Sequence, residues 1–183
     1  MVYISGGTEL LDAEKNLARL GIKAGMHVAD LGCGGAGHFI IPAAKLAGGE
    51  GRAYAVDVQK SVLSTVVGRA RLEGISNIKT VWSNIETVGA TNIPAGSLDA
   101  VFIINTLFQS KQHENICREA VRLLKPGGKL LIIDWEQTGS AFGPPPVDRV
   151  KPPAVQSITG QLGLRQIEQF NAGPNHYGFI FQK

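Results

Sequence analysis

Short apolar runs rich in valine and isoleucine recur along the chain, and segments with the helical spacing of apolar positions, such as Ser61–Leu72 and Glu114–Leu124, separate them. The five clearest runs are His27–Leu31, Arg52–Val58, Ile78–Trp82, Leu98–Ile104 and Lys129–Trp135. They are almost continuously apolar rather than alternating, which is typical of parallel strands covered by helices on both faces. The pattern therefore predicts an α/β fold with a doubly wound, mostly parallel sheet.

The N-terminal part of the chain precedes this alternation. Residues Glu9–Leu20 have the spacing of an amphipathic helix, with Thr8 as its predicted N-cap and Gly21 as its stop. The segment before it could fold over a ligand, with Tyr3 as a lid residue, or it could be a frayed terminus.

The C-terminal part predicts a reversed strand. Gly139–Pro153 is too rich in proline for regular structure and is expected to form a loop, followed by a short helix near Ala154–Leu162. The last two apolar runs, Leu164–Phe170 and Tyr177–Gln182, are joined by a connection that is too short for a parallel return. With the five runs named above, these two bring the expected number of strands to seven. The short connection predicts that the last strand is antiparallel to its neighbours.

Composition narrows the class of protein. The 183 residues carry a net charge of +3 without a run of like charges, so a nucleic-acid partner is neither required nor excluded. We expect one domain, residues 1–183, because a second one has no room. Cys33 and Cys117 stand alone without CxxC spacing, so no metal site is expected and a reducing cytoplasm fits best. The pattern leaves the oligomeric state open.

Glycine is in excess, with 23 residues in the chain, and several of them follow the first predicted strand. Gly32, Gly34 and Gly37 satisfy a dinucleotide-binding spacing in which bare backbone approaches a ligand and offers N–H donors. Asp57, about 20 residues further on at the end of the second predicted strand, can accept hydrogen bonds from both hydroxyls of a ribose. An NAD-type ligand and an adenosyl ligand would both use this arrangement.

The same residues resemble the class I S-adenosylmethionine-dependent methyltransferases. Asp30-Leu31-Gly32-Cys33-Gly34 matches their first motif, with an acid two residues before the first glycine, where nicotinamide-binding folds usually carry none. Asp57, the turn Leu124–Gly128 and the reversed last strand are also similar, so the resemblance covers nearly the whole chain. In detail the chain is similar to the small-molecule branch that includes quinone-biosynthesis methyltransferases. The resemblance implies a Rossmann-like fold and S-adenosylmethionine as the cofactor, with S-adenosylhomocysteine as product.

The resemblance also implies which residues bind the cofactor. The backbone of Gly32, Cys33 and Gly34 would hold its methionine part, with Asp30 near the amino group. At the ends of the next three strands, the expected contacts are Asp57 with the ribose, Val58 with the adenine, Asn84 with the adenine amino group, Ile85 under the ring and Asn105 near the sulfonium. Asn84 stands where the family usually has an acid, so it brings no charge to this position.

The sequence says less about which residues would contact the methyl acceptor. Trp135, His176 and Tyr177 are predicted at the carboxyl edge of the sheet and are the candidates for a substrate rim, although packing or capping the last hairpin would explain them as well. Phe108 occupies a place where related sequences often carry histidine, so no catalytic base is assigned.

Three functions follow from these residues. The leading one is methyl transfer to a small-molecule acceptor. An NAD-dependent oxidoreductase is disfavoured because the chain has no Tyr-x-x-x-Lys dyad and no second domain for a substrate. A non-catalytic adenosyl-binding subunit is the third, because Asn84 and Phe108 replace charged or polar residues of the family. Methylation of a nucleic-acid base is unsupported because Asn105-Thr-Leu-Phe108 lacks the two prolines of that signature.

Overall fold

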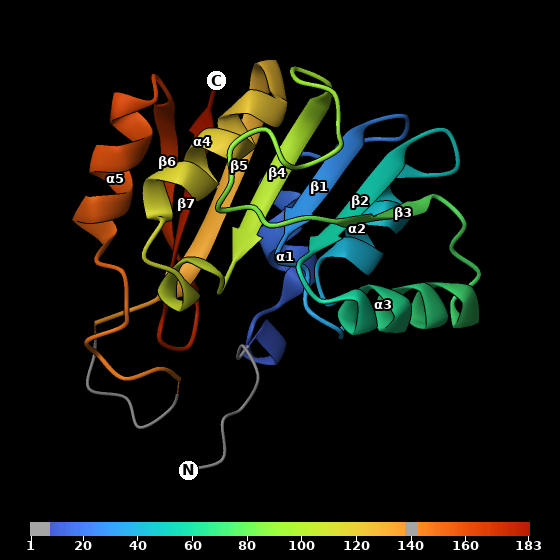
Figure 1. The fold of residues 1–183 in the computed structure, drawn as a ribbon, viewed down its shortest axis with the longest axis horizontal. Coiled ribbons are helices and arrows are strands. Elements are labelled where there is room, and N and C mark those ends of the chain that lie inside the picture. The colour runs from blue at the N-terminus through green and yellow to red at the C-terminus, as the bar shows by residue number, and fades with distance from the viewer. Residues whose placement is uncertain (1–7, 138–142) are drawn as a thin grey trace.

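The computed structural model describes residues 8–137 and 143–183, which form a seven-stranded sheet in the order β3-β2-β1-β4-β5-β7-β6 (Figure 1). The strands are β1 (His27–Leu31), β2 (Arg52–Asp57), β3 (Ile78–Trp82), β4 (Leu98–Ile104), β5 (Leu124–Trp135), β6 (Arg165–Gly173) and β7 (His176–Gln182). Strands β1 to β5 pair in parallel, and β7 is antiparallel to both β5 and β6. The predicted doubly wound sheet with a reversed last strand is confirmed.

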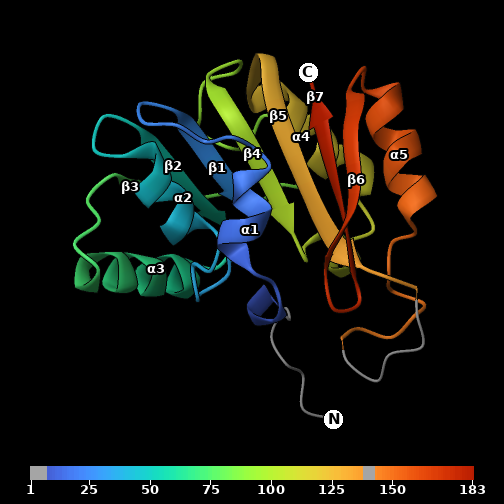
Figure 2. The same ribbon diagram turned by 180° about the vertical axis from the view of Figure 1, so that it is seen from behind.

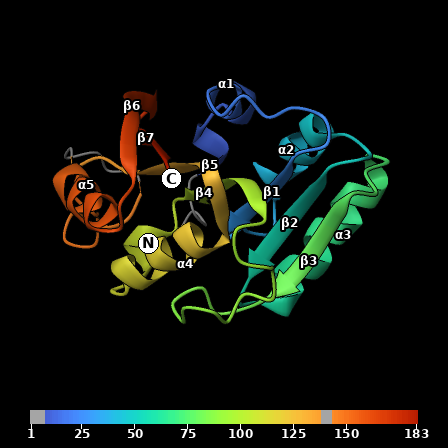
Figure 3. The same cartoon turned by 90° about the horizontal axis from the view of Figure 1, so that it is seen from above.

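Helices cover both faces of this sheet and bury one apolar cluster on each (Figures 2 and 3). On one face lie α1 (Ala13–Ala18), α2 (Ile40–Ala47) and α3 (Lys60–Leu72). On the other lie α4 (His113–Leu123) and α5 (Pro152–Gln161). Two short 3₁₀ turns complete the fold, η1 (Thr8–Leu10) and η2 (Leu107–Gln109). Coverage on both faces explains why the central strands are apolar without alternation.

Several sequence-based boundaries were wrong. Strand β5 begins at Leu124 rather than at Lys129, and two helix boundaries also differ. The first helix does not run from Glu9 with Thr8 as its cap: α1 begins at Ala13, because the Asp12 carboxylate accepts a hydrogen bond from the Lys15 N–H at 2.9 Å and caps the helix there. Pro152 and Pro153 open α5 rather than lying in the loop, since the first turn of a helix needs no N–H donor from them. The proposed lid residue Tyr3 lies outside the described residues.

The stretch of 15 residues between β3 and β4, residues 83–97, contains no helix and is held by the buried side chain of Glu119 on α4. Its carboxylate accepts hydrogen bonds from the N–H groups of Gly89 at 2.7 Å and Thr91 at 3.1 Å, and Arg122 donates to it at 2.7 and 2.8 Å. Burial disfavours ionisation, but these hydrogen bonds outweigh it and lower the pKa of Glu119 to about 2.

Replacing Glu119 with Gln should lower the free energy of unfolding by roughly 2–4 kcal/mol at pH 7, because Arg122 and the loop N–H groups lose their charged partner. The folded-state pKa lies below the ordinary value of 4.5, so this stabilisation is present above about pH 4.5 and is lost as the pH falls toward 2. Urea denaturation at pH 7 and pH 3 should show the difference shrinking in acid. Glu114→Gln, which removes an exposed ion pair with Arg118, is the control and should cost less than about 0.5 kcal/mol. Equal stability of Glu119→Gln and the unmodified chain at pH 7 would contradict this role.

Among the helices of residues 8–137 and 143–183, none is both long enough and apolar enough to cross a membrane.

Candidate functional site

The glycine loop between β1 and α2 is tied to the neighbouring strand by its backbone. The N–H groups of Gly32 and Cys33 both donate to the carbonyl of Val56 on β2, at 2.9 and 3.1 Å. Gly32 has a φ of +83°, and a Cβ atom there would lie 2.7 Å from Oγ1 of Thr106. Only glycine fits this position, since both the backbone angle and the space exclude a side chain. Helix α2 starts late, at Ile40, so the loop stays open as a non-helical backbone surface.

A cavity of about 540 Å³ lies against this loop, at the carboxyl edge of the parallel strands, which is the lower edge in Figure 1. Eight of the nine predicted cofactor residues line it: Gly32, Cys33, Gly34, Asp57, Val58, Asn84, Ile85 and Asn105. They come from the ends of four different strands, so the topology of the sheet brings together what the sequence places far apart. In open α/β sheets ligands bind at this edge, beside the point where the strand order reverses.

Asp57 bridges two elements at the cavity wall. Its Oδ1 accepts from the N–H of Gln59, just before α3, at 2.9 Å, and its Oδ2 accepts from the N–H of Gly34 at 3.3 Å. The side chain is half-buried and lines the cavity. A carboxylate held in this way offers remaining lone pairs to the vicinal hydroxyls of a sugar.

Asp30, the ninth predicted residue, lies beneath the loop and is only 2% exposed. Its Oδ1 has no hydrogen-bond partner among the described residues. Burial and the nearby charge of Asp57 raise the pKa of Asp30 to about 8. A buried carboxyl with a vacant acceptor suits a ligand that brings a cationic donor, such as an amino group. Burial also raises the pKa of the Cys33 thiol far above its usual range, so this cysteine contributes backbone rather than a reactive thiolate.

The adenine side of the predicted site offers apolar contact and an amide. Val58 is 58% exposed and Ile85 is half-buried, and both line the cavity. Asn84 is exposed, and its Oδ1 accepts a hydrogen bond from the N–H of Glu86 at 3.0 Å. Its carbonyl oxygen therefore already has a local donor but keeps a second lone pair for a ligand.

Asn105 is held from several directions just after β4. Its N–H donates to the carbonyl of Ile133 at 2.9 Å, and its own carbonyl accepts from Nε2 of Gln109 at 2.8 Å. Its φ is +50°, a conformation that asparagine tolerates better than most residues. Gln109 also lines the cavity and is a site residue that sequence reasoning missed. Gln109 lies four residues after Asn105, a spacing that brings the two residues together only if the chain turns between them. The sequence pattern did not predict that turn, η2.

The three candidates for the substrate rim are interior residues in the structure rather than an open rim, and none lines the cavity. Trp135 is 2% exposed, while His176 and Tyr177 are each 1% exposed. The Tyr177 hydroxyl donates to the carbonyl of Val150 at 3.0 Å, and the rings of Trp135 and His176 pack with their centroids 4.1 Å apart. Packing and capping, the alternative that the sequence left open, accounts for these contacts. Phe108 is also buried.

Comparison with known proteins gives the family. A family model described as "Methyltransferase domain" matches residues 22–152, which is most of the chain. A ubiquinone/menaquinone biosynthesis C-methyltransferase UbiE from Marinomonas sp. (strain MWYL1) is 30% identical over 140 residues, 75% of this chain and 53% of that protein. The UbiE protein of Pseudoalteromonas translucida (strain TAC 125) is 31% identical over 137 residues, 73% of this chain and 52% of that protein. The chain thus spans about half the length of the curated relatives it matches.

One solved structure is similar to this chain over nearly the whole length of both proteins. The S-adenosylmethionine-dependent methyltransferase from Aquifex aeolicus superposes with a TM-score of 0.85 at 28% identity, covering 97% of this chain and 93% of that one. The sheet order, the glycine loop and the cavity define a class I S-adenosylmethionine-dependent methyltransferase. The chain belongs to the methyltransferase domain family. This outcome favours the adenosyl ligand over the NAD-type ligand that the glycine spacing also allowed.

Proposed function

We propose that this chain transfers a methyl group from S-adenosylmethionine to a small-molecule acceptor. The observation that carries the proposal is the cavity in which the open glycine loop, Asp57 and Asn105 meet above the buried Asp30. The relatives act, by their names, in the biosynthesis of quinones, and this supports an acceptor of small-molecule type. We also propose that residues 1–183 work as one cofactor-binding domain in the cytoplasm, which agrees with the two buried free cysteines, Cys33 and Cys117.

The residues of the chain fit the cofactor in type and position. The unpaired acceptor of Asp30 suits its amino group, the backbone of the glycine loop suits its methionine part, and Asp57 suits its ribose. Val58 and Ile85 supply apolar contact for the adenine, and Asn84 supplies an amide at its edge. When bound, S-adenosylmethionine supplies a methyl group that is already activated by its sulfonium.

The task left to the chain is to orient the reactants and to exclude water. Asn105, which is 1% exposed and fixed through its backbone, forms a rigid part of the cavity wall. Among the described lining residues the carboxylates are Asp57 and Glu86, and Glu86 Oε1 accepts from the Ser110 hydroxyl at 2.5 Å. No histidine lines the described cavity, so an acceptor that must lose a proton would depend on Glu86 or on its own acidity.

Two measurements test the proposal. Titration calorimetry should detect S-adenosylhomocysteine binding, and no heat at millimolar ligand would refute the cofactor assignment. Radiolabelled S-adenosylmethionine added with fractionated small-molecule extracts should then label an acceptor. A protein that binds S-adenosylhomocysteine but labels no fraction would instead be the non-catalytic adenosyl-binding subunit. Label in macromolecular fractions only would contradict the small-molecule acceptor.

A further inference from the structure

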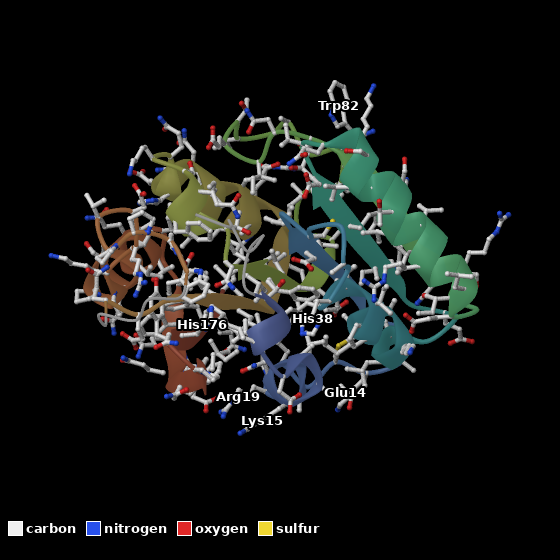
Figure 4. The ribbon with its side chains drawn as sticks, turned by 90° about the horizontal axis from the view of Figure 1, so that it is seen from below. Glu14, Lys15, Arg19, His38, Trp82 and His176 are labelled. Atoms are coloured by element: carbon white, nitrogen blue, oxygen red, sulfur yellow. The ribbon has the colours of Figure 1, made fainter. Side chains whose placement is uncertain are left out.

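We propose that His176 is a positioning residue that fixes the side chain of Asn105 at the wall of the cofactor cavity. The proposal rests on the proposed function, in which this cavity holds the adenosyl cofactor. His176 opens β7 and Asn105 follows β4, with β5 between these strands in the sheet. Nε2 of His176 nevertheless lies 3.1 Å from Nδ2 of Asn105, in a buried contact between residues 71 positions apart (His176 is labelled in Figure 4).

The hydrogen bonds of His176 define its tautomer. Nδ1 lies 2.6 Å from the carbonyl oxygen of Pro174, which can only accept, so Nδ1 carries the proton and donates. In the neutral ring Nε2 then has a free lone pair and must accept. Only the amide NH₂ of Asn105 can donate to it, so the same bond also determines which way the Asn105 amide faces. A second donor on Nε2 would break the bond.

The surroundings of His176 keep the ring neutral. It is 1% exposed and packs on Trp135, and burial lowers the pKa of His176 below its ordinary value of 6.5. The hydrogen bond to Pro174 opposes this shift, and the positive charge of Arg149 adds to it. The other titratable groups nearby are Asp134 on β5, Glu136 just after the end of that strand, and Tyr177, the next residue on β7. The bond should therefore be intact at neutral pH and should be lost only as the pH falls below 6.5.

The bond completes the fixation of Asn105. Its backbone N–H and carbonyl are engaged by Ile133 and Gln109, and the bond to His176 acts on its side chain. Positioning of a wall residue by a second residue behind it lets the site bind its ligand without reorganisation. His176 thus acts on the cofactor through Asn105 and does not line the cavity itself.

Two variants separate this role from packing. His176→Gln places a carbonyl oxygen near the position of Nε2 and should keep S-adenosylhomocysteine affinity within about threefold at pH 7.5. His176→Phe keeps an aromatic ring against Trp135 but removes the acceptor, so affinity should fall about tenfold. A packing role predicts the reverse order, because Gln cannot replace the ring. Equal affinity of His176→Phe and the unmodified chain, or a greater loss in His176→Gln, would overturn the proposal.

The pH profile gives an independent readout in the same calorimeter. Between pH 7.5 and 5, affinity should weaken more steeply in the unmodified chain than in His176→Gln, which cannot be protonated. Parallel profiles across the pH range in which the ¹⁵N shifts show His176 taking up its second proton would count against the proposal.

Nitrogen NMR tests the bond without any ligand. The ¹⁵N shifts of His176 should show the neutral tautomer protonated at Nδ1, and Asn105→Ala should shift the Nε2 resonance. A neutral tautomer protonated at Nε2, or no effect of Asn105→Ala, would overturn the proposal. If the unmodified chain binds no S-adenosylhomocysteine, the proposed function fails, and the NMR result still decides whether His176 fixes the side chain of Asn105.

Discussion

Replacing Asp57 with Ala should weaken S-adenosylhomocysteine binding at least about a hundredfold, since hydrogen bonds to a charged acceptor contribute about 1.5–3 kcal/mol each. The carboxylate bridges the glycine loop and the start of α3 through Gly34 and Gln59, so its loss also releases the loop. Asp57→Asn keeps an acceptor oxygen without the charge and should lose less affinity. Titration calorimetry at pH 7.5 measures all three proteins.

A matched control separates affinity from stability. Asp99 accepts a hydrogen bond from the His27 N–H at 2.8 Å and pairs with Lys125, at the opposite end of β1 from the glycine loop. Asp99→Ala should lower the free energy of unfolding but leave the affinity for S-adenosylhomocysteine within about twofold, because Asp99 and Lys125 do not line the cavity. An Asp57→Ala protein that binds within threefold of the unmodified chain would remove Asp57 from the ribose site.

Replacing Asp30 with Asn should stabilise the ligand-free protein while weakening its affinity for the cofactor. The folded-state pKa of Asp30 is raised from 3.8 to about 8 by burial and by Asp57, so ionisation opposes folding. This penalty is absent below about pH 4, grows as the pH rises, and reaches its full size above about pH 8. Asn carries no charge, so the variant should gain roughly 2–4 kcal/mol of stability near pH 8 and little at pH 4.

Ligand binding should show the opposite sign. A cationic amino group beside Asp30 favours the carboxylate, so binding at pH 7 should release a proton, and affinity should rise with pH up to about 8. Asp30→Asn should abolish this proton release and reduce affinity more than about tenfold. Calorimetry in buffers of different ionisation enthalpy measures the proton, and urea denaturation at pH 4 and 8 measures the stability. An Asp30→Asn variant that is less stable than the unmodified chain at pH 8 would contradict the conclusion that ionisation of the buried Asp30 carboxyl opposes folding.

Local sequence determined the sheet and the cofactor motif. His27–Leu31, Ile78–Trp82 and Leu98–Ile104 were predicted with their observed bounds, because turn residues bound them. The central strands His27–Leu31 and Leu98–Ile104 are also largely apolar because helices cover both of their faces, whereas the edge strand Ile78–Trp82 is only partly buried. The glycine loop with Asp30 and Asp57 was predicted equally well, because both acids lie within two residues of the end of a strand whose position follows from the pattern. The reversal of β7 followed from the shortness of its connection.

Local sequence predicted helix boundaries less well where two residues or two residue properties favour different boundaries. The helix before β1 begins at Ala13 because the Asp12 side chain reaches the Lys15 N–H, although Thr8 is also a residue type that caps helices. Pro152 breaks regular structure in most contexts but opens α5 here. In each case the outcome depends on which backbone groups remain unpaired once the chain is packed.

Only the tertiary structure decided what each side chain does at the edge of the sheet. The sequence placed His176, Trp135 and Tyr177 at the correct edge, but not in the interior, because burial depends on elements that pack from elsewhere in the chain. The contact of His176 with Asn105 crosses β5, and Glu119 holds a loop 30 residues before it. Periodicity reports which face of an element is apolar, whereas hydrogen bonds between distant segments depend on the register and spacing of strands, which form only when the sheet assembles.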